Sequence, residues 1–505
     1  MSYSPNLSSA FNSTTMRTQK MAVSGMCSHC SADCTGTCEI GTSAMRGAMA
    51  VYPNSMGAFM VGSEKTMPID YSHFNINGRV FGAMGVPATV EDANFYAVNL
   101  EQTIGIDNPI KMSIPVILPA LLKPNLDDYL AGAAMMGIPA IIGESVLGKY
   151  PDDVVWENGK VVKYEKLKDL LECYRKYQKD AGVVILQCNG EDDAFGLPDY
   201  AIKEAGVTAL EIKFGQSAKG TQAAIPVKDL ATALAKKAAG DIILPDPTDE
   251  KVQEAYAKKA CPPFIWYMKQ HFWTEEYLVA RVAELREMGL KNLFFKMAGY
   301  DVADMEKVLR IAAACKADMV TFDGAGGGSG FSPCKMMNEW GYPAILIEAA
   351  LVPVCKKLEA EGLLLPAIAV TGGFATEDQV YKALALGAPY VKAVGLCRST
   401  MAAAMTGKKI GELLEAGTVP NHVKAFGTTK EEVFAELGTL RWIYGEDADM
   451  FSTGAIGAYS YLKRIAFGLQ HFATLNRKFD VKYIDQSDLI PLTKEAKDIL
   501  NGTWF

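Results

Sequence analysis

The sequence lacks any apolar run long enough to cross a membrane. The longest candidate, AILIEAALVPVC at 344–355, is shorter than the roughly 18 residues that a spanning helix needs, and it carries Glu348. An excess of positive charge is also missing, because 50 Lys and Arg face 58 Asp and Glu, which gives a net charge of −8. Nucleic acids and anionic membranes both attract positive surfaces, so the sequence predicts neither as a partner.

The N-terminus lacks the apolar core of a secretion signal, and residues 1–20 are instead rich in Ser, Thr and Asn. We therefore expect a cytoplasmic protein. Global disorder is excluded, because 49% of the residues are hydrophobic and only 21% are charged. The 505 residues allow several domains, although a single α/β barrel can take about 250 residues or more.

Short apolar runs alternate with stretches of helical periodicity from about residue 108 onward. Continuous apolar runs are typical of parallel strands that are covered on both faces, and the intervening helices complete βαβ units. Eight such units predict an α/β fold, a (β/α)8 TIM barrel with an insertion at about 220–275, whereas an open doubly wound sheet is the alternative. The expected strands are 114–121, 138–144, 182–188, 208–214, 292–297, 318–324, 366–373 and 390–396.

The chain is therefore expected to have three parts. Residues 1–107 form an N-terminal arm that contains a cysteine cluster, and residues 108–409 form the barrel. Residues 410–505 are mostly of helical pattern, and we expect them to form a C-terminal extension that packs around the barrel.

Four of the eleven cysteines are clustered, and the other seven are scattered singly, as is usual for small buried side chains. A tight cluster in a chain without an export signal predicts a metal site. The compact spacing favours a [4Fe–4S] cluster, because zinc sites usually consist of two separated cysteine pairs. Zinc remains an alternative, as does a cluster of thiols that binds no metal. The four residues are Cys27, Cys30, Cys34 and Cys38.

The loops after the seventh and eighth expected strands carry the features of a phosphate site. The seventh strand ends in Thr371, Gly372 and Gly373, and the eighth is followed by Arg398. In TIM barrels these two loops often bind phosphate, since glycines let backbone N–H groups approach the anion and arginine adds a charged contact. The alternative is that the two glycines only form a tight turn.

A glycine-rich segment, TFDGAGGGSGFSP at 321–333, follows the sixth expected strand. It is not a dinucleotide fingerprint, because Ser329 stands where the third glycine would be. We interpret it as a backbone cradle for a flat cofactor, with Asp323 bonded to a ribityl or ribose hydroxyl. A wide surface turn is the alternative.

Two expected strands end near lysines, Lys213 and Lys296. A lysine that points into a barrel mouth needs a counter-charge or a polar ligand, because burying an unpaired ammonium is costly. A cation near a flavin ring stabilises the reduced anionic form of that ring. The alternative is that each lysine pairs only with a nearby carboxylate, such as Glu211 or Asp323.

Several of these segments match one known family. They are IIGES (141–145), LEIKFGQSAKG (210–220), FFKMAG (294–299), TFDGAGGGSGFSP (321–333) and VTGGFATEDQVYKALALGA (370–388). Together they resemble the FMN-binding synthase domain of glutamate synthases, in its short single-chain form. CTGTCEIGTSAMRG (34–47) and YSHFNINGRVFGA (71–83) are also similar to the front of short glutamate synthase-like proteins.

The resemblance implies an FMN site at the carboxyl-terminal mouth of the barrel, with Lys296 facing the flavin ring. It implies hydride transfer from reduced FMN to 2-iminoglutarate, which forms from 2-oxoglutarate and ammonia. The substrate would be surrounded by four catalytic residues, Glu144, Lys213, Gln216 and Lys219. The cofactor-binding residues would be Lys296, Asp323, Gly326, Gly327, Ser329, Gly330, Gly372, Gly373 and Gly395, with Arg398 as a further phosphate contact.

The sequence departs from this family in its substrate loop. AKGTQAAIPVK at 218–228 replaces the family's AKPGEGGQLPG, and the glutamine expected to bind a dicarboxylate is lost, since Gln222 is out of register. No Arg lies between 176 and 280, so an expected carboxylate clamp is missing. We therefore expect FMN and leave the substrate open between 2-oxoglutarate with ammonia and another amine or N-alkyl amino acid.

The partners follow from what the chain does not encode. It has no dinucleotide fingerprint and no cysteine at position 2 to hydrolyse glutamine, so we expect a separate ferredoxin or reductase subunit as electron donor and an amine or ammonia as nitrogen source. A second cluster is not expected, because Cys397 is the last cysteine. A non-catalytic electron-transfer subunit is a further hypothesis, and a homo-oligomer is compatible with the sequence. Hydroxy-acid oxidation is disfavoured, because none of the five histidines ends an expected strand.

Overall fold

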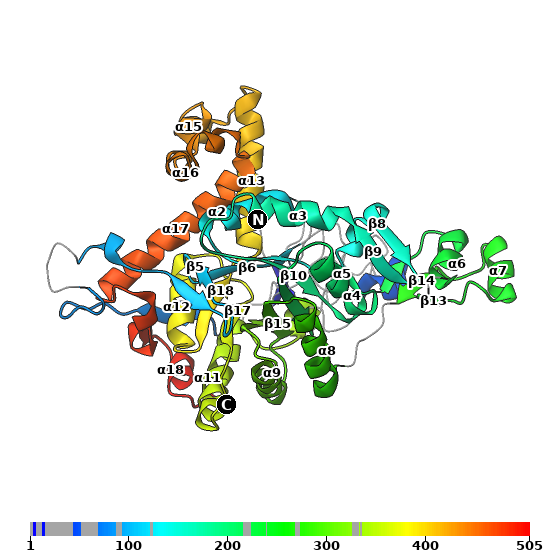
Figure 1. The fold of residues 1–505 in the computed structure, drawn as a ribbon, viewed down its shortest axis with the longest axis horizontal. Coiled ribbons are helices and arrows are strands. Elements are labelled where there is room, and N and C mark those ends of the chain that lie inside the picture. The colour runs from blue at the N-terminus through cyan, green and yellow to red at the C-terminus, as the bar shows by residue number, and fades with distance from the viewer. Residues whose placement is uncertain are drawn as a thin grey trace.

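The computed structural model describes residues 4–6, 13–15, 44–51, 69–86, 93–121, 125–215, 224–238, 240–267, 273–325, 333 and 336–504. Its centre is a closed barrel of eight parallel strands surrounded by helices (Figure 1). The barrel confirms the predicted (β/α)8 class and excludes the open sheet. The strands are β6 (Val116–Leu121), β7 (Ala140–Ile142), β10 (Val184–Cys188), β11 (Ala209–Lys213), β15 (Asn292–Ala298), β16 (Met319–Asp323), β17 (Ala367–Thr371) and β18 (Val391–Gly395).

Each strand is followed by at least one helix, as the sequence pattern predicts. Neighbouring strands pair in parallel, and β18 closes the ring by pairing with β6. The helices that follow the strands are α2 (Leu126–Met136), α3 (Glu165–Arg175), α4 (Gly190–Ala194), α5 (Leu197–Lys203), α8 (Glu275–Glu287), α9 (Val302–Ala314), α10 (Met336–Glu339), α11 (Ala344–Ala360), α12 (Glu377–Leu386) and α13 (Arg398–Glu415).

A layer of apolar side chains fills the barrel interior towards its amino-terminal end. One inward side chain from each strand meets in a buried cluster, which includes Ile117, Phe294 and Met319. Side chains from the hairpin of β4 (Gln102–Ile104) and β5 (Ile110–Met112) pack into the same cluster. The hairpin therefore closes the amino-terminal end of the barrel, and it leaves the carboxyl-terminal end for chemistry.

The insertion expected after the fourth strand forms a small antiparallel sheet of its own. Its strands are β12 (Ala224–Pro226), β13 (Ile242–Leu244) and β14 (Ile265–Tyr267), with α6 (Leu230–Ala238) and α7 (Glu250–Ala257) beside them. In Figure 1 it lies at the opposite end of the molecule from the C-terminal helices. A second hairpin, formed by β8 (Val154–Glu157) and β9 (Lys160–Tyr164), was not predicted. Asn158 and Gly159 form its turn with positive φ angles, so the Asn-Gly pair was an unused hairpin signal.

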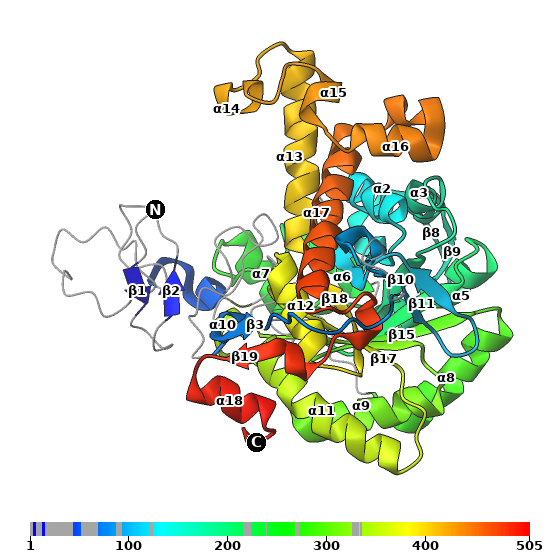
Figure 2. The ribbon, with the colours of Figure 1, turned by 90° about the vertical axis from the view of Figure 1, so that its left-hand side faces the viewer.

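The C-terminal extension is mostly helical, as predicted. Figure 2 shows α13 and α17 (Thr453–Leu475) side by side, projecting from the barrel with α14 (Asn421–Lys424), α15 (Lys430–Val433) and α16 (Leu437–Tyr444) at their far end. The two long helices approach closely, because a side chain at Gly407 of α13 would collide with the backbone of Thr453. α17 also packs on α2, where Gly132 leaves no room beside Ala458. Small residues thus allow α17 to pack closely against α13 and α2, and this packing holds the extension on the barrel.

A segment from the N-terminal part of the chain and one from the C-terminal part meet beside α12. The strand β3 (Phe74–Ile76) pairs antiparallel with β19 (Leu489–Pro491), and α18 (Lys494–Leu500) follows it. The sequence did not predict this pairing, because neither short strand has a clear alternating pattern. Within the described residues, no helix is both long enough and apolar enough to cross a membrane.

Candidate active site

A layer of polar side chains lies directly above the apolar half of the barrel. Side chains alternate between the two faces of a strand, so residues two or four positions after an inward apolar residue also point inward. Ala209 is in the inner apolar cluster, and Glu211 and Lys213 follow it on β11. The same spacing from Phe294 places Lys296 inside, and strand pairing sets Lys213 beside Lys296. The buried polar layer consists of Gln187, Glu211, Lys213, Lys296, Thr321, Asp323 and Thr371.

Lys296 is held between two carboxyl groups in this layer. Its Nζ lies 3.9 Å from Asp323 Oδ2, and both side chains are buried. Burial alone would lower the pKa of Lys296, but the carboxylates of Asp323 and Glu211 outweigh it and raise that pKa above its ordinary value. These two carboxylates therefore favour the protonated form of Lys296. The predicted pairing with Asp323 is present, at a distance that leaves both groups able to contact a ligand.

Two buried oxygens in the same layer have no hydrogen-bond partner in the part of the chain that the structure describes. They are Glu211 Oε2 and Thr321 Oγ1. The other oxygen of Glu211 accepts a short hydrogen bond from Gln187 Nε2. Burial raises the pKa of Glu211, and the nearby Lys296 and Gln187 offset only part of that rise. Buried polar atoms in native proteins almost always have partners, so these two atoms fit a site that receives a polar ligand.

Lys213 forms a tight ion pair with Glu144. Lys213 Nζ lies 2.6 Å from Glu144 Oε1, and their side chains are 6% and 12% exposed. Asn189 Nδ2 donates to the other oxygen of Glu144 at 3.4 Å, and the side chain of Asn189 also caps the start of α4. The pair joins β11 to the loop after β7. Lys213 thus has a carboxylate partner, as the alternative expected, and the partner found is Glu144, where Glu211 was one of the examples named.

The glycines at the ends of β17 and β18 have different roles. Gly372 has φ +127° and lies so close to β16 that an added Cβ would come within 2.9 Å of Gly324 Cα. Gly373 has φ +111°, and its Cβ position faces open space. An open position beside backbone N–H groups suits an anion. Gly395 is packed instead, because a Cβ there would lie 2.6 Å from Pro119 Cγ. Arg398 is exposed at the start of α13.

The remaining predicted site residues lie outside the described residues, and their roles stay predictions. Within the described ranges, no group of three His, Cys, Asp or Glu side chains could hold a metal ion. Of the described cysteines, Cys188, Cys315 and Cys355 are buried and none is in a disulfide, as expected for scattered small side chains. The site residues outside the described part are Cys27, Cys30, Cys34, Cys38, Gln216, Lys219, Gly326, Gly327, Ser329 and Gly330.

The match to a known family covers the second half of the barrel. The family described as conserved region in glutamate synthase matches residues 266–406, which include Lys296, Asp323 and the glycines of β17 and β18. The archaeal glutamate synthase [NADPH] of Archaeoglobus fulgidus is 30% identical over 223 residues, or 43% of this chain and 38% of that protein. Over this part of its length the chain is similar to glutamate synthases. The archaeal-type glutamate synthase [NADPH] of Thermotoga neapolitana is 36% identical over 100 residues, or 19% of each chain. The chain thus spans well under half the length of these relatives.

Solved structures that can be superposed on this chain have lower sequence identity to it. The flavin-binding domain of baker's yeast flavocytochrome b2 has a TM-score of 0.46 at 12% identity, and covers 84% of this chain and 78% of its own. A mandelate oxidase variant with (S)-mandelic acid has a TM-score of 0.44 at 14% identity, and covers 83% of this chain and 86% of its own.

Three polar residues of this site were missed by the sequence reasoning. Gln187, Asn189 and Thr321 were not singled out, although Gln187 and Asn189 lie at the carboxyl end of β10 and Thr321 lies in the middle of β16. Every second residue after the inward Ile185 should also point into the barrel, and this rule would have identified Gln187 and Asn189. Polar residues within otherwise apolar strand segments were the sequence feature that could have revealed them.

The loop after β17 is braced by the N-terminal segment. Phe374 follows Gly373, and its ring lies 5.1 Å from the ring of Tyr71 between centroids. The hydroxyl of Tyr71 donates a 3.0 Å hydrogen bond to Glu348 Oε2 on α11. Glu348 is fully buried, and its other oxygen has no hydrogen-bond partner among the described residues. Burial raises the pKa of Glu348 well above its ordinary value of 4.5, and the Tyr71 hydroxyl lowers it only in part.

We expect Glu348→Gln to flatten the dependence of stability on pH. The folded wild type keeps a proton on Glu348 above pH 4.5, and the unfolded chain releases it, so folded stability is lost as the pH rises from 4.5 toward the folded pKa. The wild type should lose about 1.4 kcal/mol per pH unit relative to the variant in that window. Urea unfolding of both proteins from pH 4 to 8 measures the difference.

The exposed Glu415→Gln variant on α13 is the matched control, and its curve should run parallel to that of the wild type. Parallel curves for wild type and Glu348→Gln would show that Glu348 is ionised in the folded protein, against this account.

Proposed function

We propose that the protein is an FMN-dependent oxidoreductase that transfers a hydride at a C–N bond of an amino or imino acid. The specific reaction to test is the formation of glutamate from 2-oxoglutarate and ammonia. The family match supports this proposal, because it covers the part of the barrel that holds Lys296 and Asp323. The protein would work in the cytoplasm, with its electrons delivered by a separate ferredoxin or reductase.

The observation that carries the proposal is the polar layer of the barrel. A buried cation at Lys296 lies beside Asp323, and two buried oxygens, Glu211 Oε2 and Thr321 Oγ1, lack partners in the described chain. These groups fit a polar, flat cofactor whose hydroxyls and ring atoms would satisfy them. The residues proposed to hold FMN are Lys296, Asp323, Gly326, Gly327, Ser329, Gly330, Gly372, Gly373, Gly395 and Arg398.

FMN, when bound, supplies a ring that takes up or gives back two electrons as a hydride. Lys296 places a fixed positive charge in the mouth, where it would stabilise negative charge on a reduced ring. Its carboxyl neighbours Asp323 and Glu211 hold the ammonium in position and keep it protonated. The chain's own contribution to the redox step is thus an electrostatic one.

The pair of Lys213 and Glu144 is proposed to handle the substrate. A substrate carboxylate or imine nitrogen that reaches Lys213 meets an ammonium already bound at 2.6 Å to Glu144. A proton on this short hydrogen bond can pass to the substrate nitrogen, and Asn189 holds Glu144 from the other side. Gln216 and Lys219, which lie outside the described residues, are proposed to complete the substrate site.

The four clustered cysteines, Cys27, Cys30, Cys34 and Cys38, are proposed to bind a [4Fe–4S] cluster that passes electrons to the flavin. Four cysteines in so short a segment satisfy the ligand count of such a cluster. Metal analysis of anaerobically purified protein distinguishes the cluster from zinc, since only the first contains iron and acid-labile sulfide.

The function is tested by reoxidation of the reduced protein. Protein reduced anaerobically with a low-potential chemical donor is mixed with 2-oxoglutarate and ammonium, and both the flavin absorbance and the glutamate formed are followed. The proposal expects flavin reoxidation matched by glutamate. If the flavin is reoxidised instead by another imino acid, the reaction type stands and the substrate is corrected. If no imino acid of a panel reoxidises it, hydride transfer to a C–N bond is refuted.

A further inference from the structure

A cavity of about 380 Å³ lies at the amino-terminal end of the barrel, away from the polar layer. One wall is formed by the turn from α12 into β18, which includes Pro389, and by the start of β18, which includes Lys392. The opposite wall is the segment 481–487, and Gln102 of the closing hairpin lines the cavity as well. Gly395, at the other end of β18, belongs to the proposed flavin mouth. The cavity is therefore separate from the site described above.

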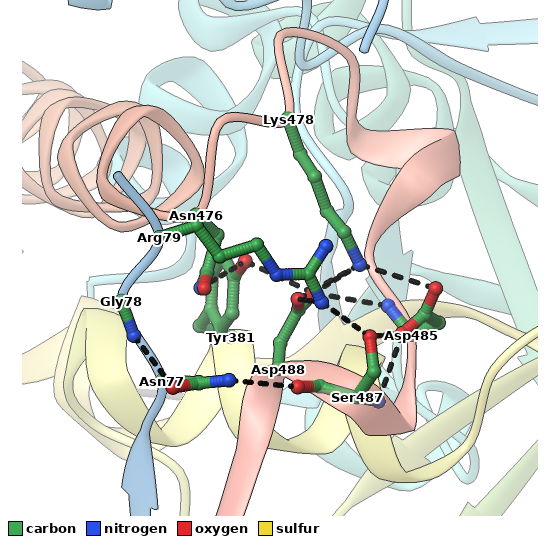
Figure 3. A network of polar contacts seen from close by, with 9 residues as sticks. All are labelled: Asn77, Gly78, Arg79, Tyr381, Asn476, Lys478, Asp485, Ser487 and Asp488. Atoms are coloured by element: carbon green, nitrogen blue, oxygen red, sulfur yellow. Dashed lines mark hydrogen bonds and ion pairs between the residues drawn. The ribbon is translucent and has the colours of Figure 1, made fainter. Parts of the chain in front are cut away.

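The wall formed by residues 481–487 is anchored by ion pairs and a hydrogen bond to neighbouring parts of the chain. Figure 3 shows Lys478 reaching toward Asp485 and Asp488, and its Nζ lies 3.1 Å and 2.8 Å from their carboxylate oxygens. Lys478 and Asp488 are both completely buried. Gln486 Nε2 also donates to Leu386 O at 2.9 Å, which ties this wall to the end of α12. The cavity is thus a built feature of the fold, and it lies within the size range of small-molecule sites.

The charges on the cavity wall do not balance among themselves. Asp485 lies 3.1 Å from Lys478, a lysine that it shares with Asp488, and Lys482 pairs with Asp480 at 3.3 Å. The side chain of Lys392 is half-buried, and its ammonium makes no hydrogen bond or ion pair in the described part of the chain. Burial lowers the pKa of Lys392, with no carboxylate to oppose it. A half-buried ammonium without a counter-ion is costly, and an anion in the cavity would remove that cost.

We propose that this cavity binds a small organic anion whose carboxylate or phosphate pairs with Lys392. The amide of Gln102 provides a neutral polar contact on the same wall, and the apolar Leu384 and Val391 cover the carbon skeleton. The volume suits a compact metabolite and not a nucleotide-sized or polymeric ligand. The site is at the opposite end of the barrel from the proposed flavin, and it does not depend on the proposed reaction.

Calorimetric titration of the full chain, saturated with FMN, tests the proposal. The probes are citrate and malate as carboxylates, and glycerol 3-phosphate and inorganic phosphate as phosphates. At least one probe should bind saturably with one site per chain. Lys392→Met should weaken that binding about tenfold or more, because it removes a charge-assisted contact. The class of the bound probe identifies which anion the site takes.

Two further variants keep the result unambiguous. Lys392→Arg retains the charge and should keep measurable binding, whereas Lys203→Met, an exposed lysine on α5, should bind like the wild type. Circular dichroism shows whether Lys392→Met is folded. The proposal is overturned if no probe binds saturably to the wild type, or if Lys392→Met binds the probe as tightly as the wild type. Either result leaves the proposed flavin reaction untouched, because it measures binding and not turnover.

Discussion

Lys478→Met is expected to lower the free energy of unfolding by about 3–5 kcal/mol, because it removes the buried cation nearest to Asp488 and leaves only the partly exposed Arg79 to pair with that buried carboxylate. Lys478 and Asp488 are both fully buried, and Nζ lies 2.8 Å from Asp488 Oδ1. Asp488 also accepts hydrogen bonds from Tyr381 at 3.2 Å and from Arg79 at 3.4 Å. The network joins the N-terminal segment, α12 and the C-terminal strand (Figure 3). Chemical denaturation of both proteins measures the loss.

Lys409→Met is the matched control for this prediction. Lys409 lies on α13 with a side chain that is 65% exposed, and it pairs with Glu412 at 3.4 Å. Its loss should cost no more than about 1 kcal/mol. The double variant Lys478→Met with Asp488→Asn should recover part of the stability, because no unpaired charge stays buried. Equal effects of Lys478→Met and Lys409→Met would contradict the role given to the network.

Lys213→Met is expected to slow hydride transfer roughly 10²–10³-fold while the flavin content is unchanged. The prediction rests on the proposed function. Removing the ammonium leaves Glu144 without the partner that lies 2.6 Å away, and it removes the group proposed to bind the substrate. Single-turnover reoxidation of the reduced flavin measures the rate, and the absorbance of the released flavin measures its content.

The control for Lys213 is Lys203→Met, on the outer surface of α5. It should leave both rate and flavin content as in the wild type. Glu144→Gln should weaken substrate binding less than Lys213→Met does, because the oxygen of the new amide can still accept a hydrogen bond from Lys213. A Lys213→Met rate within about threefold of the wild type would exclude Lys213 from the substrate site.

The barrel was predictable because its strands carry a strong local signal. Each is buried on both faces, so each appears as a continuous apolar run, and all eight runs became barrel strands. The hairpin of β8 and β9 was missed, although Asn158 and Gly159 mark its turn. The pairing of β3 with β19 had no local signal at all, because it joins residues that are about 400 positions apart in the sequence.

The site was only partly predictable, because a sequence gives strand ends but not the register between strands. Lys213 and Lys296 were identified from their place at strand ends, and the structure brings them together on paired strands. The partner of Lys213 could not be chosen, since Glu211 is close in sequence whereas Glu144 is close in space. Glu144 could not be recognised as this partner, because it lies 69 positions before Lys213 in the sequence.

The central claim is that the mouth of the barrel holds FMN against Lys296 and Asp323. Its most direct measurement is the flavin content of the purified full-length chain after reconstitution with FMN and gel filtration, for the wild type and for Asp323→Ala. The account predicts stoichiometric FMN in the wild type and its loss in a folded Asp323→Ala variant. A folded wild-type protein that retains no flavin would contradict the account, and so would an Asp323→Ala variant that binds FMN as tightly as the wild type.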